Sequence, residues 1–317
     1  MNVSRLIPTA AVAGAVVLGL TALTACSASD AADHKNGDKL NVVASFYPMQ
    51  FLAEQIGGKH VSVTTLTKPG VEPHDLELTP RQIGGLGDAD YILYLKGIQP
   101  AVDDAIKQSG SKDAVDASTL TVLEDHGTET GADEHGHENH GDKAGADPHI
   151  WLDPVKYAEV AKGVGKSLEK TDPDHAADYR KNTDTLVHKL DALNTAYETG
   201  LKDTATKTFI TTHSAFGYLA ERYGLTQEGI AGVDPEAEPS PARISEIHTV
   251  AKKNKVTTVF FETLASDKTA KTLAKDTGLK TDVLDPLEGI TDKSKGDNYI
   301  EVMQSNLAAL QKALGAK

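Results

Sequence analysis

The sequence predicts an α/β protein of two similar lobes, each with a parallel-type sheet, joined by one long backbone helix. Two observations carry this prediction. Short apolar runs alternate with amphipathic segments in both halves of the chain, and a long amphipathic stretch separates the two halves. At 317 residues the chain is long enough for two lobes that each bury a core.

Residues 1–25 have the pattern of a lipoprotein signal peptide. Arg5 precedes an apolar run over 6–25 without any charge, and the segment LTAC that closes it resembles a bacterial lipobox. The resemblance implies that Cys26 becomes the lipidated first residue, which anchors the protein to the outer face of the bacterial cell membrane. A spanning helix, or a cleavable signal with a chance cysteine, is the alternative. Residues 26–38 are small and polar, and they predict a tether.

Residues 39–171 are predicted to form the N-terminal lobe. Its expected elements are a strand at 40–45, a helix that ends at Gly57 and Gly58, a strand at 60–67, a helix with Thr79 as N-cap, the buried strand YILYLKG, and a helix at about 154–170. Residues 124–146 interrupt this pattern, because Gly, Asp, Glu and His leave no apolar residue larger than alanine there. This composition predicts a solvated, His-rich loop.

Residues 172–204 are predicted to form the backbone helix between the lobes. Side chains that suit a buried face recur every three or four residues, at Tyr179, Thr183, Leu186, Leu190, Leu193 and Tyr197. A helix of roughly 30 residues would span about 45 Å, more than one lobe needs. Residues 205–317 then repeat the alternation and predict the C-terminal α/β lobe, which closes with a helix from Asp297 to Leu314.

The composition argues against nucleic-acid binding and against structures that need several cysteines. The chain has 46 acidic residues against 32 Lys plus Arg, a net charge of −14, and such a surface repels phosphate backbones. Nucleic acid is therefore not an expected partner. Separately, we expect the protein to be a monomer. Cys26 is the only cysteine, so disulfides within the chain and thiolate metal cages are excluded.

In four places a potential metal ligand stands where a strand ends and a helix or turn begins. These are His74 in GVEPHDLELTP, His149 in DPHIWLDP, His213 in FITTHSAFGYLA, and Asp285 or Glu288 in DVLDPLEGI. Three imidazoles and a carboxylate suit a tetrahedral first-row ion such as Zn²⁺. Since the ligands come from both halves, and open α/β folds bind ligands where strands end, we expect the site in the cleft between the lobes.

The fourth ligand is left open by the sequence. Asp285 precedes Pro286 and is placed to cap the turn, Glu288 has the longer reach, and a bound water is the third alternative. Asp153 or Glu77 is expected either to accept the second N–H of a ligating imidazole or to serve as a helix cap or surface charge. The remaining histidines of the two lobes are expected at the surface: His60, His175, His188 and His248.

Several motifs in order resemble the zinc and manganese substrate-binding lipoproteins of bacterial ABC importers, called cluster A-I or cluster 9. They are VVASFYPMQFLAEQIGG, GVEPHDLELTP, DPHIWLDP, TTHSAFGYLAERYGL, EAEPSPARI and LDPLEG. The resemblance implies two α/β lobes bridged by one rigid helix, with the metal buried between them. By position, His74, His149 and His213 match the metal-binding histidines, and Asp285 and Glu288 match alternative fourth ligands. Manganese members tend to have a carboxylate in place of His213, so a third imidazole favours zinc.

The His-rich loop carries a second group of potential ligands, His126, His135, His137 and His140. Because no apolar residues flank them, they predict at most weak, auxiliary metal capture, and a solvated insertion without a metal role is the alternative. The resemblance supports metal capture, since zinc members commonly carry such a loop.

Together these features predict an extracytoplasmic binding protein that captures Zn²⁺ as cargo and delivers it to an ABC permease driven by its ATPase. A receptor for Mn²⁺ or another divalent ion is the alternative within the same family. A zinc hydrolase is less favoured, because HExxH is absent and no Ser or Cys lies in a recognisable nucleophile elbow, so we do not expect an enzyme. An adhesin role has no sequence feature that selects it.

Overall fold

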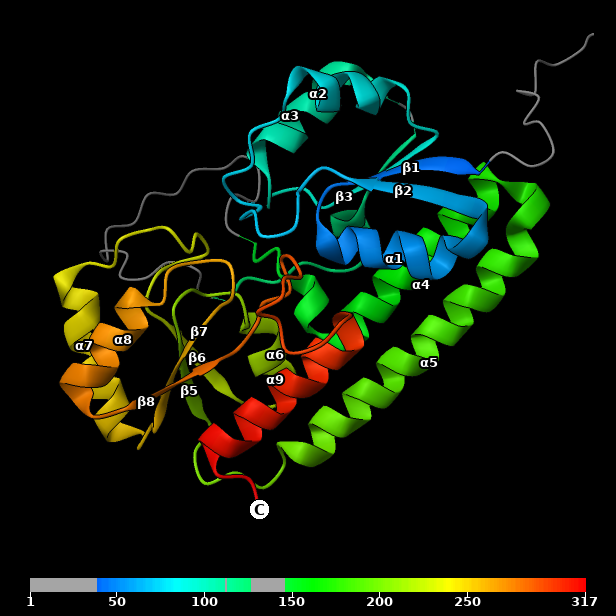
Figure 1. Ribbon diagram of the computed structural model, residues 1–317. Coiled ribbons are helices and arrows are strands. Elements are labelled where there is room, and N and C mark those ends of the chain that lie inside the picture. The colour runs from blue at the N-terminus through cyan, green and yellow to red at the C-terminus, as the bar shows by residue number, and fades with distance from the viewer. Residues whose placement is uncertain (1–38, 112, 127–145) are drawn as a thin grey trace, which may run out of the picture. The chain divides into compact units, whose positions relative to one another are not determined.

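The computed structural model describes residues 39–111, 113–126 and 146–317 (Figure 1). The expected signal peptide, tether and lipidation site at Cys26 lie outside the described residues, as do His135, His137 and His140. Within the described ranges, no helix has both the length and the apolar character that crossing a membrane requires. Residues 39–317 group into one compact unit, so both lobes and the contacts between them can be described together.

The first sheet is parallel and has the strand order β2-β1-β3-β4. Its strands are β1 (Leu40–Ala44), β2 (Val61–Thr65), β3 (Tyr91–Tyr94) and β4 (Ala114–Asp116). Its helices are α1 (Tyr47–Gly57), α2 (Pro80–Gly87), α3 (Pro100–Ser109) and α4 (Pro154–Thr171). Because side chains alternate along a strand, Val43 packs with the residues of α2 and α3, whereas Val42 belongs to the core beneath α1 and α4. Figure 1 shows these two helix pairs on opposite sides of the sheet.

The second sheet repeats this arrangement, with the order β6-β5-β7-β8 and parallel pairing throughout. Its strands are β5 (Thr208–Thr211), β6 (Thr226–Gly229), β7 (Thr258–Phe261) and β8 (Lys280–Val283). Its helices are α6 (Gly217–Arg222), α7 (Pro241–Lys253), α8 (Lys268–Thr277) and α9 (Tyr299–Leu314). The prediction of two similar parallel-sheet lobes is confirmed.

The long helix is α5 (Ala176–Gly200), with 25 residues. It is shorter than the expected helix because Pro173–His175 forms a separate 3-10 turn and the α-helix ends at Gly200. Helix α5 packs against α1 and α4 of the first lobe and α9 of the second (Figure 1). The Tyr197 hydroxyl donates a hydrogen bond to the Met303 carbonyl at 2.7 Å, which fixes the end of α5 to α9.

One apolar core continues from the first lobe into the second. At its centre the ring of Tyr299, at the start of α9, lies 4.7 Å from that of Tyr157 and 5.4 Å from that of Phe51. The Tyr299 hydroxyl donates to the Trp151 carbonyl at 2.5 Å. Separation of the two lobes would break this shared packing, which therefore opposes opening between them.

Candidate metal centre

Four side chains from four separate segments meet between the two sheets. His74 comes from the loop between β2 and α2, and His149 directly precedes the 3-10 turn Ile150–Leu152. His213 follows β5 by two residues, and Glu288 lies in the turn after β8. One ligand atom from each lies within 4.8 Å of the others. The side chain of His74 is 10% exposed, and those of the other three are 0–2% exposed.

The spacing of these atoms fits a tetrahedral ion. Oε1 of Glu288 lies 3.4 Å from Nε2 of His74, 3.4 Å from Nε2 of His149 and 3.5 Å from Nε2 of His213. With metal–ligand distances of about 2.0–2.1 Å, the edges of a tetrahedral zinc site are about 3.4 Å long. Among the described atoms, Nε2 of His149 and of His213 is buried without a hydrogen-bond partner, which is costly unless a ligand is bound there.

Two buried carboxylates fix the orientation of two of these imidazoles. Asp147 Oδ1 is 2.8 Å from Nδ1 of His149 and also accepts the His149 backbone N–H at 2.9 Å. Glu262, at the end of β7, places Oε1 2.8 Å from Nδ1 of His213. A carboxylate at Nδ1 holds the proton on that nitrogen and leaves the Nε2 lone pair directed at the site.

Since Asp147 and Glu262 are the partners of His149 and His213, Asp153 and Glu77 follow the other alternative, as a helix cap and a surface charge. Asp153 caps α4 by accepting the Val155 N–H at 2.8 Å, and it pairs with Arg222 across the lobes at 2.6 Å. Glu77 lines a separate cavity beside α2 and α3. Asp147 lies only two residues before His149, so this partner could have been found from the local sequence, whereas Glu262 is 49 residues from His213.

The turn that carries Glu288 is built by Asp285. Asp285 Oδ1 accepts the Leu287 N–H at 2.8 Å, and Oδ2 accepts the Thr263 hydroxyl at 3.2 Å. Leu287 has a φ of 60°, an uncommon conformation for leucine, and the indole N–H of Trp151 donates to the Pro286 carbonyl at 2.7 Å. Asp285 therefore shapes the turn, whereas Glu288 extends to the three imidazoles.

The carboxylates and imidazoles of the site shift one another's pKa values. Burial alone would raise the pKa of Glu288, but the close approach of the imidazoles of His149, His213 and His74 holds it well below its usual range. Burial opposes protonation of His149 and His213, yet Asp147, Glu262 and Glu288 raise their pKa values. Burial and the nearby Glu288 raise the pKa of Glu72 to about 9, so Glu72 is neutral at pH 7. Without an ion the cluster holds protons, which a divalent cation displaces.

The other histidines lie elsewhere. His126, expected in an unstructured loop, is ordered, and only 9% of its side chain is exposed beside Glu124 and Glu221. His60 was expected at the surface, but only 12% of its side chain is exposed, because its ring stacks on that of His175 with centroids 3.8 Å apart. His188 is exposed on α5, as expected.

The chain is similar to proteins that are named for zinc uptake and zinc binding. Residues 42–313 match the family model ZnuA, described as zinc-uptake complex component A, periplasmic. The high-affinity zinc uptake system protein ZnuA of Bacillus subtilis is 41% identical over 297 residues, which cover 92% of each chain. The zinc-binding lipoprotein AdcA of Streptococcus pneumoniae is 38% identical over 295 residues, covering 91% of this chain but only 58% of the relative. The chain thus spans little more than half the length of that relative.

Solved structures show the same fold. The Zn(II)-bound ZnuA-like domain of Streptococcus pneumoniae AdcA has a TM-score of 0.73 and 35% identity, and the match covers 87% of this chain and 99% of that one. The laminin-binding protein Lmb of Streptococcus agalactiae, described as an adhesin with metal-transporting activity, has a TM-score of 0.76 and 32% identity, with 87% and 99% coverage.

Proposed function

This chain belongs to the ZnuA family of periplasmic components of zinc-uptake complexes, and we propose that it captures Zn²⁺ through His74, His149, His213 and Glu288. The observation that carries this proposal is the convergence of three imidazole nitrogens on one carboxylate oxygen at 3.4–3.5 Å. These separations match the edges of a tetrahedral zinc site. Asp285 supports the turn and is not a ligand in this proposal.

Zinc is favoured over manganese by the donor atoms. Three neutral imidazoles and a single carboxylate suit a borderline ion, whereas Mn²⁺ prefers more oxygen ligands. Two relatives that match the chain, from Streptococcus pneumoniae and Bacillus subtilis, are named for zinc. Cu²⁺ binds such donors at least as tightly, so the natural cargo also depends on metal supply.

A transport role suits the site better than hydrolysis. Four protein ligands complete a tetrahedron, whereas a catalytic zinc keeps one position for water. We therefore propose that the ion is held as cargo and passed to an ABC permease with its ATPase. Turnover of an ester or peptide that a chelator abolishes, and that Glu288→Ala increases, would instead support a hydrolase.

We further propose that the chain works as a lipid-anchored monomer outside the cytoplasm. The lipobox-like segment before Cys26 supports this anchor, and one relative is named a lipoprotein. In this arrangement residues 1–25 are removed, 26–38 tether the protein, and the lobes at 39–171 and 205–317 flank the helix segment 172–204. His135, His137 and His140 would collect ions near the site.

Metal content tests the cargo directly. The protein would be purified from its native envelope, dialysed against a weak chelator, and analysed for elements before and after competition with excess Mn²⁺. The proposal predicts one retained zinc per chain that Mn²⁺ does not displace. Retained manganese, or exchange of zinc by equimolar Mn²⁺, would contradict it.

A further inference from the structure

Three glutamates, which we call the glutamate triad, converge beside the four-ligand site. Glu72 lies in the loop between β2 and α2, Glu262 directly follows β7, and Glu288 is the carboxylate of the zinc site itself. One carboxylate oxygen from each lies within 4.8 Å of the others. Glu262 is 4% exposed and Glu288 is 0% exposed, so little water can screen their charges. Buried carboxylates this close together need a positive charge near them.

Each glutamate of the triad has one oxygen engaged and one without a partner. Oε1 of Glu72 accepts the His74 backbone N–H at 3.2 Å. Oε1 of Glu262 is 2.8 Å from Nδ1 of His213. Oε1 of Glu288 faces the imidazoles of the zinc site. Among the described atoms, Oε2 of all three glutamates is buried without a hydrogen-bond partner. Since an unpaired buried oxygen is costly, these atoms point to a positively charged ligand.

Glu72 differs from its counterpart in the first lobe, Asp147. Each stands two residues before a histidine of the zinc site, with a proline between them. Asp147 Oδ1 accepts the His149 backbone N–H at 2.9 Å and is 2.8 Å from Nδ1 of the same residue. Glu72 accepts the equivalent N–H of His74, but within the described residues no hydrogen bond joins it to the His74 ring. The longer side chain thus leaves an oxygen for the triad.

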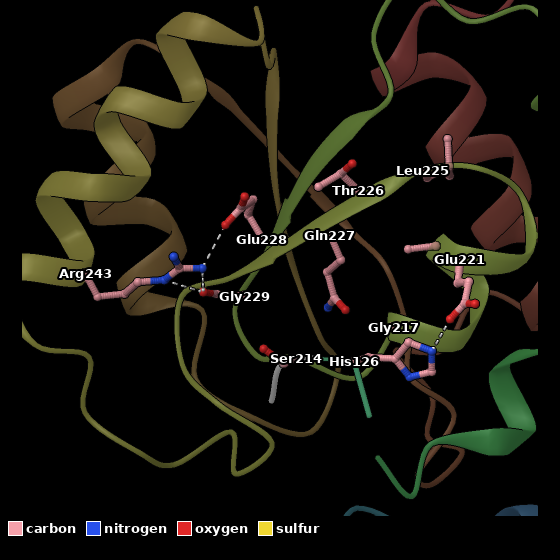
Figure 2. A pocket seen from close by; sticks show the side chains of 11 residues that line it. His126, Ser214, Gly217, Glu221, Leu225, Thr226, Gln227, Glu228, Gly229 and Arg243 are labelled. Carbon is pink, nitrogen blue, oxygen red and sulfur yellow. Dashed lines mark hydrogen bonds and ion pairs between the residues drawn. The ribbon is translucent and has the colours of Figure 1, made fainter. Parts of the chain in front are cut away.

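The charged groups of the polar cavity beside α6 are already paired, in contrast to the triad (Figure 2). Nε2 of His126 is 2.7 Å from Oε2 of Glu221, and its Nδ1 is 3.1 Å from Oδ2 of Asp147. Arg243 donates to Glu228 at 3.0 Å. The unpaired, buried oxygens of the triad are therefore the stronger indication of an ion.

We propose that Glu72, Glu262 and Glu288 form a second cation site, which binds a hard divalent ion such as Mn²⁺ next to the zinc. Carboxylate oxygens are the ligands that hard divalent ions prefer, and water would complete the coordination. Glu288 would bridge the two ions, with Oε1 on zinc and Oε2 on the second ion. Ions in such two-metal sites are about 3.5–4 Å apart. This inference rests on the proposed function, because it places zinc in the four-ligand site.

Charge favours the second ion and also limits its affinity. When ionised, the triad carries three negative charges, one more than a single Zn²⁺ neutralises. In the metal-free protein burial and the nearby Glu288 raise the pKa of Glu72 to about 9, so an incoming cation has to displace a proton. The neighbouring Zn²⁺ also repels a second divalent ion. The second ion therefore binds more weakly than zinc and is lost on dialysis, whereas zinc is retained.

Manganese binding to the zinc-loaded full chain tests the second site. The protein is loaded with one equivalent of Zn²⁺ and titrated with Mn²⁺, and the EPR signal of free Mn²⁺ gives the number of bound ions. We expect Glu72→Gln to bind one Mn²⁺ fewer per chain than the unchanged protein, because the amide keeps the volume but cannot carry the charge. The matched control Glu77→Gln changes an exposed glutamate of the same segment and should keep that ion.

A second variant and the zinc content complete the test. Glu262→Gln, kept in saturating Zn²⁺, should lose the same Mn²⁺ ion. Equal manganese binding by Glu72→Gln and the unchanged protein would overturn the second site, as would loss of zinc from Glu72→Gln, which would assign Glu72 to the zinc site. If the unchanged protein fails to bind one Zn²⁺, the proposed function fails instead, so the two failures are distinguishable.

Co²⁺ in place of zinc tests whether the two ions share Glu288. Co²⁺ accepts imidazole and carboxylate ligands and is paramagnetic. At a separation of about 3.5–4 Å, its spin should broaden the EPR signal of bound Mn²⁺, whereas diamagnetic Zn²⁺ should not. A bound-Mn²⁺ signal that is the same beside Co²⁺ and beside Zn²⁺ would place the second ion elsewhere and refute the shared carboxylate.

Discussion

The inner site, formed by His74, His149, His213 and Glu288, and an outer cluster, formed by Glu124, His126 and Glu221, combine histidine and carboxylate side chains at different depths. In each, a histidine held by Asp147 presents Nε2 to a carboxylate. The inner side chains are 0–10% exposed, whereas the outer glutamates are 38% and 64% exposed. Exposed side chains must be ordered when an ion binds, and this cost lowers their affinity. Depth and prior ordering, more than the number of histidines nearby, therefore favour the inner site over the outer cluster for binding an ion.

The inner site is also fixed by contacts between the lobes. Trp151 of the first lobe holds the Pro286 carbonyl of the Glu288 turn, and Asp153 of the first lobe pairs with Arg222 of the second. Tyr218 donates to the Asp147 carbonyl at 2.7 Å, so the second lobe also positions a residue that supports His149. Each lobe thus fixes ligands of the other.

The largest expected effect comes from removing an inner histidine. His149→Ala deletes a buried ligand and leaves three, so zinc affinity should fall by more than about 100-fold, beyond what loss of a supporting hydrogen bond costs. Deleting residues 126–140 should lower it far less, because these ligands are outside the inner site. Competition with a chromophoric chelator measures the zinc affinity of both variants, and His188→Ala, which changes an exposed histidine, is the control. Equal losses would remove the distinction between the two clusters.

The turn after β8 carries both the proposed ligand Glu288 and Asp285, whose carboxylate accepts hydrogen bonds that shape the turn. Glu288→Gln should lower zinc affinity by at least the roughly 10-fold that loss of a supporting partner costs, because an amide oxygen is a weaker ligand than a carboxylate. Asp285→Asn should instead lower the free energy of unfolding of the metal-free protein by about 1–3 kcal/mol through its turn hydrogen bonds. Denaturant unfolding and chelator competition on both variants show which residue binds zinc and which stabilises the turn. The assignment is reversed if Asp285→Asn causes the larger loss of affinity.

Glu262 provides a test in which no zinc ligand is changed. Glu262→Gln keeps the volume but weakens the hold on Nδ1 of His213, and zinc affinity should drop about 10-fold, the lower end for such partners. The matched control is Glu221→Gln, which changes a glutamate of the outer cluster and should leave zinc affinity within about twofold. Unchanged affinity in Glu262→Gln would show that His213 is oriented without it.

Protons should compete with zinc at the inner site. The pKa values of His149 and His213 are raised, so these imidazoles carry protons at a pH above the ordinary histidine value of about 6.5. Binding must release them, and apparent affinity should fall about tenfold per pH unit for each proton released as the pH decreases from 8 to 6. Titrations in buffers of different ionisation enthalpy measure the protons directly. Affinity that stays constant down to pH 6.5 would contradict the raised pKa values.

Much of the fold was predictable because it depends on local sequence patterns. The alternation of apolar runs and amphipathic segments predicts both lobes. The Pro-His pairs single out His74 and His149, but the expectation that these two follow strand ends was wrong: His74 lies in the loop between β2 and α2, and His149 directly precedes a 3-10 turn. The role of Glu262 was not predictable, since it lies 49 residues from His213 and meets it only because β5 and β7 are neighbours. The burial of His126 was not predictable either, because the ring that packs against it, Tyr218, is distant in sequence and belongs to the other lobe.

The most direct test of the inner site is an anomalous difference map at the zinc edge, from crystals of protein loaded with one equivalent of Zn²⁺. We expect one strong peak within about 2.0–2.2 Å of Nε2 of His74, His149 and His213 and of a carboxylate oxygen of Glu288. A dominant peak at Glu124, His126 and Glu221, or a zinc bound by Asp285 in place of Glu288, would contradict the account.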